Sequence, residues 1–356
     1  MKKKVGIIGT NGLPAKYGGF ETLTNYLVRD LSKDFDLTVY CSNLHKDERL
    51  QQYNGAKLVY IPLSANGIQG VLYDILSILH SLFSMDVLLI LGSSGTVVLP
   101  INFFFRKKVV FNFGGLEWQR EKWNFIAKKF LKISEAFGVR YANTIVVDNA
   151  VFAEYVKNSY DKESRLIEYG GDHVLPANNQ GILEKYGISF PQYFLSVSRA
   201  QEDNYIHLLL DAFVKVPELN LVVISNWKIS SYGINLKENY SGYQNIKLVD
   251  AVYEQVDLDI IRSNAKWYIH THSKCGSAPS LIEAISLGLP IISYDVPANR
   301  STTEEKAVYF NNTAELINIL KKINEYNSKE YAASMREIAS RRYKWEIISK
   351  KYSELF

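Results

Sequence analysis

The most chemically informative stretch of the sequence lies between residues 270 and 295. A loop of small and polar residues there leads into Pro279, which favours the first helical position because it lacks an N–H. An apolar run then predicts a short helix, which Gly288 and Pro290 end. Backbone N–H groups and the positive end of this helix predict an anion site suited to a phosphate or diphosphate. The residues predicted to form it are Cys275, Gly276, Ser277, Ala278, Pro279 and Ser280.

Glu283 is the acid of this stretch, one helical turn after Pro279. Its carboxylate could reach a sugar hydroxyl of a ligand bound at the helix start. Alternatively, Ser280 and Glu283 form the S-x-x-E pattern of a capping box, in which the acid only closes the helix end. Pro279 favours the ligand role, because it predicts a helix that begins before Ser280. His270 and His272 alternate along the preceding strand end without the partners of a metal site, so we expect no metal.

A second candidate loop, GTNGLPAKYGGFE, spans residues 9–21 after the first predicted strand. Its spacing is not the G-x-G-x-x-G of a dinucleotide site. The second predicted strand ends in Cys41-Ser42, without the acid that would hold an adenosine ribose. Gly18 and Gly19 are the better candidates for contact with a phosphate or sugar, since bare backbone allows close approach. The alternative is that these glycines only permit a tight turn.

Strands and helices must position these loops, and the hydrophobic pattern predicts them in alternation, as in parallel sheets with crossover helices. In the first round we expect strands at residues 5–9, 37–41, 58–61, 87–91, 109–113, 144–147 and 165–167, and helices at 20–31, 71–83, 123–141 and 150–156. In the second round we expect strands at 194–197, 221–224, 246–248, 267–269 and from 291, and helices at 206–214, 279–287, 313–323 and 328–355. Turn-rich residues 172–179 predict the linker.

The composition is that of an ordinary soluble globular protein. The 356 residues exceed one ordinary core, so two domains are expected. A net charge of +4 is too small to indicate nucleic acid, and we expect none as a partner. Cys41 and Cys275 are far apart, which excludes a disulfide framework and fits a reducing cytoplasm.

Residues 103–140 mix basic and aromatic side chains, a combination typical of a membrane surface or of a solvated helix face over a core. The first apolar run is too short for a signal peptide. Residues 87–105 approach the roughly 20 residues that span a bilayer. The Gly-Ser-Ser-Gly turn at 92–95 and Pro100 interrupt them, however, so two buried elements are predicted. We expect a peripheral protein at most.

Four blocks of the sequence resemble one family. GTNGLPAKYGGFETL is similar to the opening motif of a bacterial subgroup of retaining, glycogen-synthase-like GT-B glycosyltransferases, which includes polysaccharide rhamnosyltransferases. NFGGLEWQREKW (residues 112–123), VVDNAVFAEYV with EYGGD (146–156 and 168–172) and APSLIEAISLGLPII (278–292) match further blocks in the expected order. The resemblance thus covers nearly the whole chain. It implies two Rossmann-like, doubly wound α/β domains that face a cleft.

The resemblance also implies roles for single residues. Glu283 matches the second acid of the E-x7-E element, which holds the nucleotide ribose. Arg199 matches the basic residue that neutralises the donor diphosphate, and Gly18 and Gly19 match the loop over the sugar phosphate. The polar positions that the family places near the sugar or acceptor correspond to Asp148, Tyr169 and Glu117. Asp148 could alternatively be only the N-cap of the next helix.

Three positions depart from the family pattern. Cys275 stands where much of the class has the first acid of the E-x7-E element, so the usual carboxylate on the donor sugar is missing. Asn204 and Tyr205 replace a Lys partner of Arg199, which leaves the diphosphate to Arg199 and backbone. Gly114 replaces an expected Asp, which puts the acceptor contacts of that loop in doubt.

The resemblance predicts an acceptor domain at 1–172, a nucleotide-sugar domain at 173–340, and a terminal helix at 341–356 that packs back on the first domain. The expected reaction is transfer of a sugar, best L-rhamnose from TDP-rhamnose, to a lipid-linked saccharide in capsule or O-antigen assembly. It would retain configuration and use no metal or other cofactor, in the cytoplasm at the inner membrane face. Alternatives are a transferase using a UDP- or GDP-sugar, a nucleotide-sugar 2-epimerase, a nicotinamide dehydrogenase and a non-catalytic nucleotide-sugar sensor.

Overall fold

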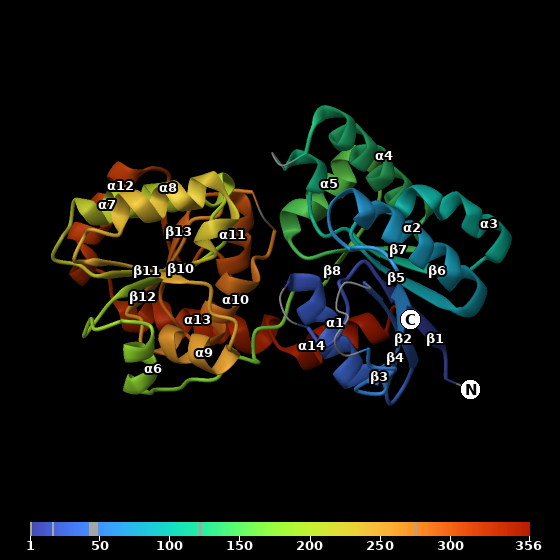
Figure 1. The fold of residues 1–356 in the computed structure, drawn as a ribbon, viewed down its shortest axis with the longest axis horizontal. Coiled ribbons are helices and arrows are strands. Elements are labelled where there is room, and N and C mark those ends of the chain that lie inside the picture. Colours follow the sequence, from blue (N-terminus) through green and yellow to red (C-terminus); the bar gives the residue numbers. More distant parts are fainter. Residues whose placement is uncertain (1, 16–17, 43–48, 121–122, 275) are drawn as a thin grey trace. The chain divides into compact units, whose positions relative to one another are not determined.

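The computed structural model describes residues 2–15, 18–42, 49–120, 123–274 and 276–356. The chain forms two compact units, seen in Figure 1. One unit combines Met1–Tyr169 with Trp345–Phe356, and the other is Gly170–Lys344. The chain therefore leaves the first unit slightly before the predicted boundary at 172. It returns slightly after the predicted boundary at 340.

An eight-stranded sheet forms the centre of the first unit, in the order β3-β4-β2-β1-β5-β6-β7-β8. Neighbouring strands are parallel except for β3 and β4. All five residues of β5 are apolar and buried, as expected for a parallel strand covered on both faces. The strands are β1 (Lys4–Ile8), β2 (Asp36–Ser42), β3 (Gln52–Tyr53), β4 (Ala56–Ile61), β5 (Val87–Leu91), β6 (Lys108–Asn112), β7 (Thr144–Val147) and β8 (Arg165–Leu166).

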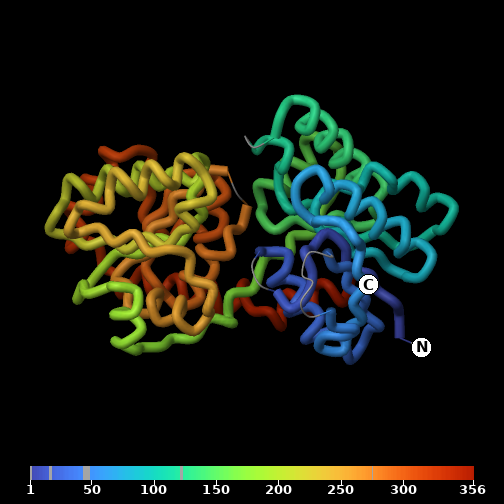
Figure 2. Tube along the Cα trace, viewed as in Figure 1, coloured from blue at the N-terminus to red at the C-terminus, as the bar shows by residue number. Residues whose placement is uncertain are grey.

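The helices of the first unit come from both ends of the chain. They are α1 (Gly19–Leu31), α2 (Gly67–Ser84), the 3-10 helix η1 (Thr96–Ile101), α3 (Asn102–Phe105), the 3-10 helix η2 (Glu117–Gln119), α4 (Phe125–Tyr141), α5 (Ala150–Tyr160) and α14 (Trp345–Ser353). Helix α14 packs beside α1, and the tube in Figure 2 shows this last, red segment among the blue ones. The ring of Trp345 stacks on that of Tyr26 with centroids 4.3 Å apart. The Tyr352 hydroxyl accepts a 2.7 Å hydrogen bond from the Asn112 amide.

The second unit contains a six-stranded, entirely parallel sheet in the order β11-β10-β9-β12-β13-β14. Its strands are β9 (Phe194–Val197), β10 (Leu221–Ser225), β11 (Ile246–Asp250), β12 (Trp267–His270), β13 (Ile291–Tyr294) and β14 (Val308–Phe310). Its helices are α6 (Gln180–Lys185), η3 (Glu202–Asn204), α7 (Ile206–Val214), η4 (Trp227–Ile229), α8 (Ser231–Tyr240), α9 (Gln255–Ser263), α10 (Pro279–Ser286), α11 (Pro297–Thr303), α12 (Thr313–Lys321), η5 (Ile323–Glu325) and α13 (Ser328–Arg342).

Each sheet has one point at which the strand order changes direction. In the first unit the chain places β2 on one side of β1 and β5 on the other. In the second unit β10 and β12 flank β9 in the same way. Ligands of doubly wound sheets bind beyond the carboxyl ends of the strands at such points. The predicted α/β architecture of two doubly wound sheets is confirmed, and the loops after β1 and β9 lie where ligands are expected.

Some elements differ from the sequence-based predictions. The helix predicted at 328–355 is two helices, because Tyr343 leaves the helical conformation between α13 and α14. Residues 172–179 are not a free linker, because the Leu175 N–H donates to Asp259 (3.0 Å) and the Ala177 N–H to Ser263 (3.1 Å) within the second unit. Of the two elements predicted to be buried in 87–105, only β5 is. Within the described residues, no helix is both long and apolar enough to cross a bilayer.

Candidate active site

Two loops of the second unit are bound together at its switch point. The loop after β9 carries Asp203 and Asn204, and the loop after β12 carries Thr271 and Ser273. The Ser273 N–H and hydroxyl both donate to the Asp203 carbonyl, at 3.0 and 2.8 Å. The Thr271 hydroxyl donates to the Asn204 carbonyl. The loop that carries Arg199 and the predicted anion-binding loop before α10 are therefore held together by the fold.

Arg199 lies in the first of these loops, two residues after β9. Its side chain is half-buried, and its guanidinium has no hydrogen-bond or ion-pair partner within the described part of the chain. The Arg199 carbonyl accepts a 2.7 Å bond from the amide of Asn204, which is itself buried. Asn204 therefore fixes the backbone of the loop and leaves the cation available to a ligand.

Helix α10 begins at Pro279, as predicted, with Ala278 as its N-cap and no side chain capping the first turn. Ser280 lies inside the helix, so Ser280 and Glu283 do not form a capping box. Gly276 and Ser277 precede Ala278 in the loop, and both Ser277 and Ala278 are buried. Cys275, which stands where much of the class has the first acid of the E-x7-E element, lies outside the described residues.

The Glu283 carboxylate is held by two side chains that the sequence analysis did not single out. Its Oε1 lies 3.2 Å from Nε2 of His173, and its Oε2 accepts from Nη2 of Arg262, a guanidinium that is 1% exposed. Burial alone would raise the pKa of Glu283, but the charges of Arg262 and His173 outweigh it and lower the pKa. Glu283 is therefore an ionised, oriented carboxylate with 14% of its side chain exposed.

The EYGGD segment explains how His173 reaches this carboxylate. A Cβ on Gly171 would lie 2.3 Å from Oγ of Ser286 and 2.8 Å from Cγ2 of Ile282, both on α10. Only glycine allows the backbone to approach α10 this closely. The close approach brings His173, two residues later, against Glu283.

In the first unit, Glu21 organises the loop after β1. Its Oε1 accepts from both the backbone and the side-chain nitrogen of Asn11, each at 2.8 Å. Gly18 has φ 124°, and a Cβ there would lie 1.9 Å from the other Glu21 oxygen. Gly18 is therefore required by the packing of this buried acid, and Gly19 begins α1. These glycines therefore serve the local backbone turn, and this does not exclude contact with a ligand.

Gly114 stands where the family pattern suggests Asp, and its environment leaves no room for a side chain. Its φ is 67°, and a Cβ would lie 2.5 Å from Cζ of Phe20. The Phe20 ring also lies against Gly92 in the loop after β5. Phe20 thus occupies the space between the loops after β5 and β6.

Asp148 and Tyr169 lie together in the first unit, each following a strand of the sheet. Asn149, not Asp148, is the N-cap of α5, since its side chain accepts from the Val151 N–H at 3.1 Å. Asp148 therefore does not need to cap the helix. Burial raises the pKa of Tyr169, and the charge of Asp148 raises it further. Tyr169 is thus a neutral hydroxyl next to an acid.

Glu117 is paired within its own loop. Its Oε2 lies 2.7 Å from Nε of Arg120, and its Oε1 accepts from the Trp123 indole at 3.2 Å. The adjacent Trp118 indole donates to the buried Glu135 at 2.9 Å. A direct role of Glu117 toward a ligand would require it to exchange these partners.

The neighbouring imidazoles His270 and His272 have ring centroids 4.3 Å apart. Burial, followed by the charge of His272, holds the pKa of His270 well below its usual range, so His270 is neutral. Over the ranges that the structure describes, no three His, Cys, Asp or Glu side chains are grouped to hold a metal ion.

Solved structures share this fold along its whole length. Sucrose-phosphate synthase from Thermosynechococcus elongatus superposes with a TM-score of 0.81 at 14% identity, over 99% of this chain and 98% of that chain. HepE from Anabaena, in complex with UDP, superposes with a TM-score of 0.77 at 14% identity, over 99% of both chains. A putative UDP-N-acetylglucosamine 2-epimerase from Listeria monocytogenes superposes with a TM-score of 0.65 at 13% identity, over 99% of this chain and 95% of that one.

Family models separate the two units. Residues 2–172 match a domain of unknown function (DUF1972), and residues 182–342 match the glycosyl transferases group 1. The protein is a glycosyltransferase of the GT-B fold. No curated protein sequence is significantly similar to the chain.

The residues of this glycosyltransferase that sequence reasoning missed are Arg262, His173 and Glu21. Arg262 lies on α9, a short helix of mixed polarity that was not predicted. His173 was hidden in the supposed linker. Glu21 could have been found from its position, since a lone acid three residues after Gly18 in a ligand loop is a candidate partner for backbone N–H groups.

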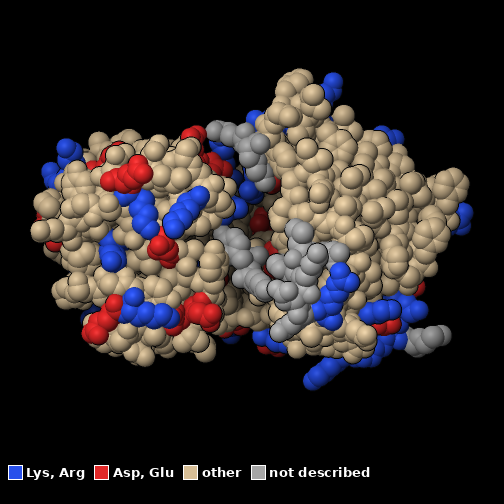
Figure 3. All heavy atoms as spheres, viewed as in Figure 1, with Lys and Arg blue, Asp and Glu red and all other residues tan. Residues whose placement is uncertain are grey.

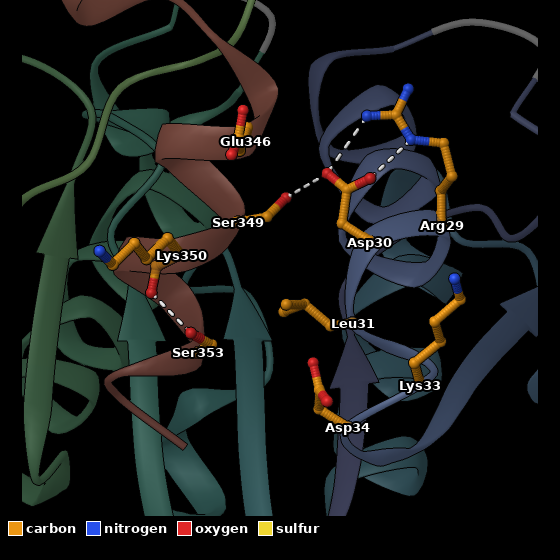
Figure 4. A pocket seen from close by; sticks show the side chains of 9 residues that line it. All are labelled: Arg29, Asp30, Leu31, Lys33, Asp34, Glu346, Ser349, Lys350 and Ser353. Atoms are coloured by element: carbon orange, nitrogen blue, oxygen red, sulfur yellow. Dashed lines mark hydrogen bonds and ion pairs between the residues drawn. The ribbon is translucent and has the colours of Figure 1, made fainter.

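One shallow groove of the glycosyltransferase, of about 470 Å³, lies apart from the predicted site residues (Figure 4). Arg29, Asp30, Leu31, Lys33, Asp34, Glu346, Ser349, Lys350 and Ser353 line it. Asp30 accepts from Arg29 at 2.6 Å and from the Ser349 hydroxyl at 2.7 Å, so the groove joins α1 to α14.

Proposed function

We propose that this glycosyltransferase moves L-rhamnose from TDP-rhamnose to a lipid-linked saccharide during surface-polysaccharide assembly, with retention of configuration and without a metal. The half-buried Arg199 guanidinium carries the proposal, because it is a cation without a partner in the described structure at the switch point of the second unit. An anionic diphosphate is the ligand that such a group suits. The complex of HepE with UDP supports a nucleotide donor.

Stabilisation of the leaving group would supply most of the catalysis. As the bond from the sugar C1 to the diphosphate oxygen breaks, negative charge develops on the diphosphate. Arg199 and the N-terminal end of α10 would stabilise that charge. The acceptor hydroxyl bonds to C1 on the same face and passes its proton to the departing phosphate oxygen. No protein carboxylate needs to act as nucleophile in this route.

Glu283 would bind the sugar of the nucleotide. Its pairing with Arg262 and His173 keeps it ionised, so that it can accept hydrogen bonds from ribose hydroxyls. A TDP donor offers only the 3′-hydroxyl, whereas UDP and GDP also offer the 2′-hydroxyl. Loss of Glu283 should therefore weaken UDP more than TDP if both bind. A transferase using a UDP- or GDP-sugar is the alternative.

The first unit would bind the acceptor. Asp148 and Tyr169 offer a carboxylate next to a neutral hydroxyl, which suits the hydroxyl groups of a saccharide. Glu117 would contribute after leaving Arg120 and Trp123. A lipid-linked acceptor would bring residues 103–140 to the inner face of the cytoplasmic membrane, and no nucleic acid is involved.

Calorimetric titration with TDP-rhamnose, UDP-glucose, a GDP-sugar and NAD tests the donor. We expect TDP-rhamnose to bind tightest of these ligands. Incubation with labelled donor and a lipid-linked acceptor should yield a glycosidic linkage whose anomeric configuration, measured by NMR, is the same as that of the donor. Preference for a UDP- or GDP-sugar would reassign the donor. Release of an epimerised sugar without acceptor would favour the epimerase that the Listeria structure suggests. Binding of NAD alone would overturn the proposal.

A further inference from the structure

Helix α2 turns an apolar face outward. Ile68, Leu72, Leu76 and Phe83 lie on the exposed side and are 45–82% exposed. The buried side of the same helix instead includes glycine, three serine or acid positions and only a few large apolar groups. A surface helix of a soluble domain normally has the opposite polarity. The outer face of α2 therefore requires a partner other than water.

The apolar face continues over the neighbouring elements. The Phe83 ring packs edge-on against Phe105 at the end of α3, with centroids 4.8 Å apart. Helix η1 contacts α2, α3 and α4, so these elements are contiguous. Exposed apolar residues on them are Ile101, Phe103, Phe104, Phe125, Ile126 and Ile133. We call this set, together with the four residues of α2, the apolar face.

Charge around the apolar face is predominantly basic. Arg106, Lys108 and Lys129 are exposed among its residues, against one exposed acid, Asp86, while the nearby acids Asp74 and Glu135 are buried. Figure 3 shows the area over α2 and α3 as almost uniformly tan, with Lys and Arg atoms at its edge. An apolar centre with a basic rim is complementary to lipid tails beneath anionic headgroups.

The charges decide between two occupants. A second copy of the chain would bring the same basic rim against itself in a two-fold contact, which repels. We propose that the apolar face inserts into the headgroup region of an anionic membrane. The face extends the stretch 103–140 with α2. The proposed membrane insertion rests on the proposed function only for its purpose, which is access to a lipid-linked acceptor.

Vesicle co-sedimentation of the full chain tests the proposal. A face variant carries Ile68→Ser, Phe104→Ser and Phe125→Ser. A matched control carries Leu175→Ser, Ile229→Ser and Val256→Ser, three comparably exposed apolar residues of the second unit. Wild type and control should bind phosphatidylglycerol-containing vesicles equally, and the face variant at least about tenfold more weakly. High salt and pure phosphatidylcholine should both weaken the binding of wild type.

The outcomes separate the two proposals. Equal binding by the face variant and the control, or no binding of wild type to anionic vesicles, would overturn the membrane face. So would a wild-type dimer in light scattering that the face variant dissociates, since a second copy would then be the occupant. Calorimetric donor binding, measured on the same three proteins without vesicles, should be unchanged. Its absence in all three would count against the proposed function alone.

Discussion

At the scale of single residues, Arg199 is the sharpest test of the chemistry. Arg199→Ala removes the cation that would stabilise the departing diphosphate, so kcat should fall by about 10²–10³-fold. The melting temperature should stay near that of wild type, because the guanidinium has no partner in the described structure to lose. Transfer assays with labelled donor and thermal melts measure both. The exposed Lys329→Ala is the control and should change neither.

The pair of Arg262 with Glu283 should behave as a buried ion pair. Arg262→Met leaves an unpaired acid and should cost about 3–5 kcal/mol of unfolding free energy. The double variant Arg262→Met/Glu283→Gln should recover part of this loss, because Glu283 no longer carries an unpaired charge, while the buried Asp259 still loses its 3.8 Å ion pair with Arg262. Arg341→Met, at an exposed arginine paired with Glu337 and Glu304, should cost only about 0–1 kcal/mol. Denaturant unfolding measures all of these, and a double variant less stable than Arg262→Met would contradict the assignment.

The same pair sets a pH dependence. The pKa of Glu283 is lowered in the folded protein, so its ionisation stabilises the fold above the unfolded pKa of about 4.3. That stability is lost as the pH falls through the lower folded pKa. The difference between wild type and Arg262→Met should therefore shrink below about pH 4.

At this scale the sequence could predict where candidate site residues lie along the chain. It could not predict which side chains they contact. Arg199 and Glu283 were found because they follow or enter recognisable strand-loop-helix patterns. Arg262 and His173 reach Glu283 from segments 21 and 110 residues away along the chain. Such pairings follow from tertiary packing, and no local pattern encodes them.

At the scale of elements, α2 contains a buried acid that makes stability depend on pH. Burial raises the pKa of Asp74 to about 7, and the Ser94 hydroxyl, which donates to it, lowers the pKa in part. The folded state therefore favours the protonated acid. The contribution of Asp74 to the free energy of unfolding should be fully present below the unfolded pKa of about 3.9. It should be lost as the pH rises to about 7.

Asp74→Asn removes this dependence while keeping a group that can accept from Ser94. At pH 8 the variant should be more stable than wild type by on the order of 2–4 kcal/mol, and near pH 4 the two should be similar. Denaturant unfolding at both values measures the difference. Parallel curves for wild type and variant from pH 4 to pH 8 would show that Asp74 does not titrate in this range.

Substitutions at three glycines distinguish the stability cost of backbone strain from the cost of close packing. Gly114 and Gly67 both have φ 67°, but only Gly114 has a neighbour, Phe20, where a Cβ would lie. Gly67→Ala should cost about 1–2 kcal/mol from the left-handed backbone alone. Gly114→Ala should cost roughly 1–3 kcal/mol more, because the ring of Phe20 must move. Gly242→Ala, with open space and no positive φ, should be nearly neutral, and thermal melts of the three variants rank them.

Elements with a strong pattern were predictable, and those with a weak one were not. The bounds of β5, β7, β9 and α7 agree with the prediction, because short runs of Val, Ile and Leu between polar residues leave little choice. Helices α8, α9 and α11 are short, at seven to ten residues, which gives a periodic pattern few positions in which to show. The break before α14 carries no Gly or Pro.

At the scale of the whole molecule, the last helix is a structural part of the first unit. Trp345, Ile348, Tyr352 and Phe356 are each 0–4% exposed. Each such side chain contributes about 1.5–3 kcal/mol on burial, a sum comparable to the net stability of a domain. A chain that ends at Lys344 should therefore lose the folded first unit.

Limited proteolysis followed by mass spectrometry measures this outcome. The fragment Gly170–Lys344 should survive in the shortened chain, while residues 1–169 are digested. The same fragment expressed alone should also fold, since it has its own sheet and core. Protection of residues 1–169 in the shortened chain would show that α14 is dispensable.

The place of α14 in the chain also imposes an order on biosynthesis. The ribosome releases all of Gly170–Lys344 before it releases Trp345, so the later unit can finish folding while the earlier one is still open. Until then, the nascent first unit exposes the site that Trp345 and Tyr352 will fill. The time spent translating the second unit thus sets how long that surface is available to chaperones.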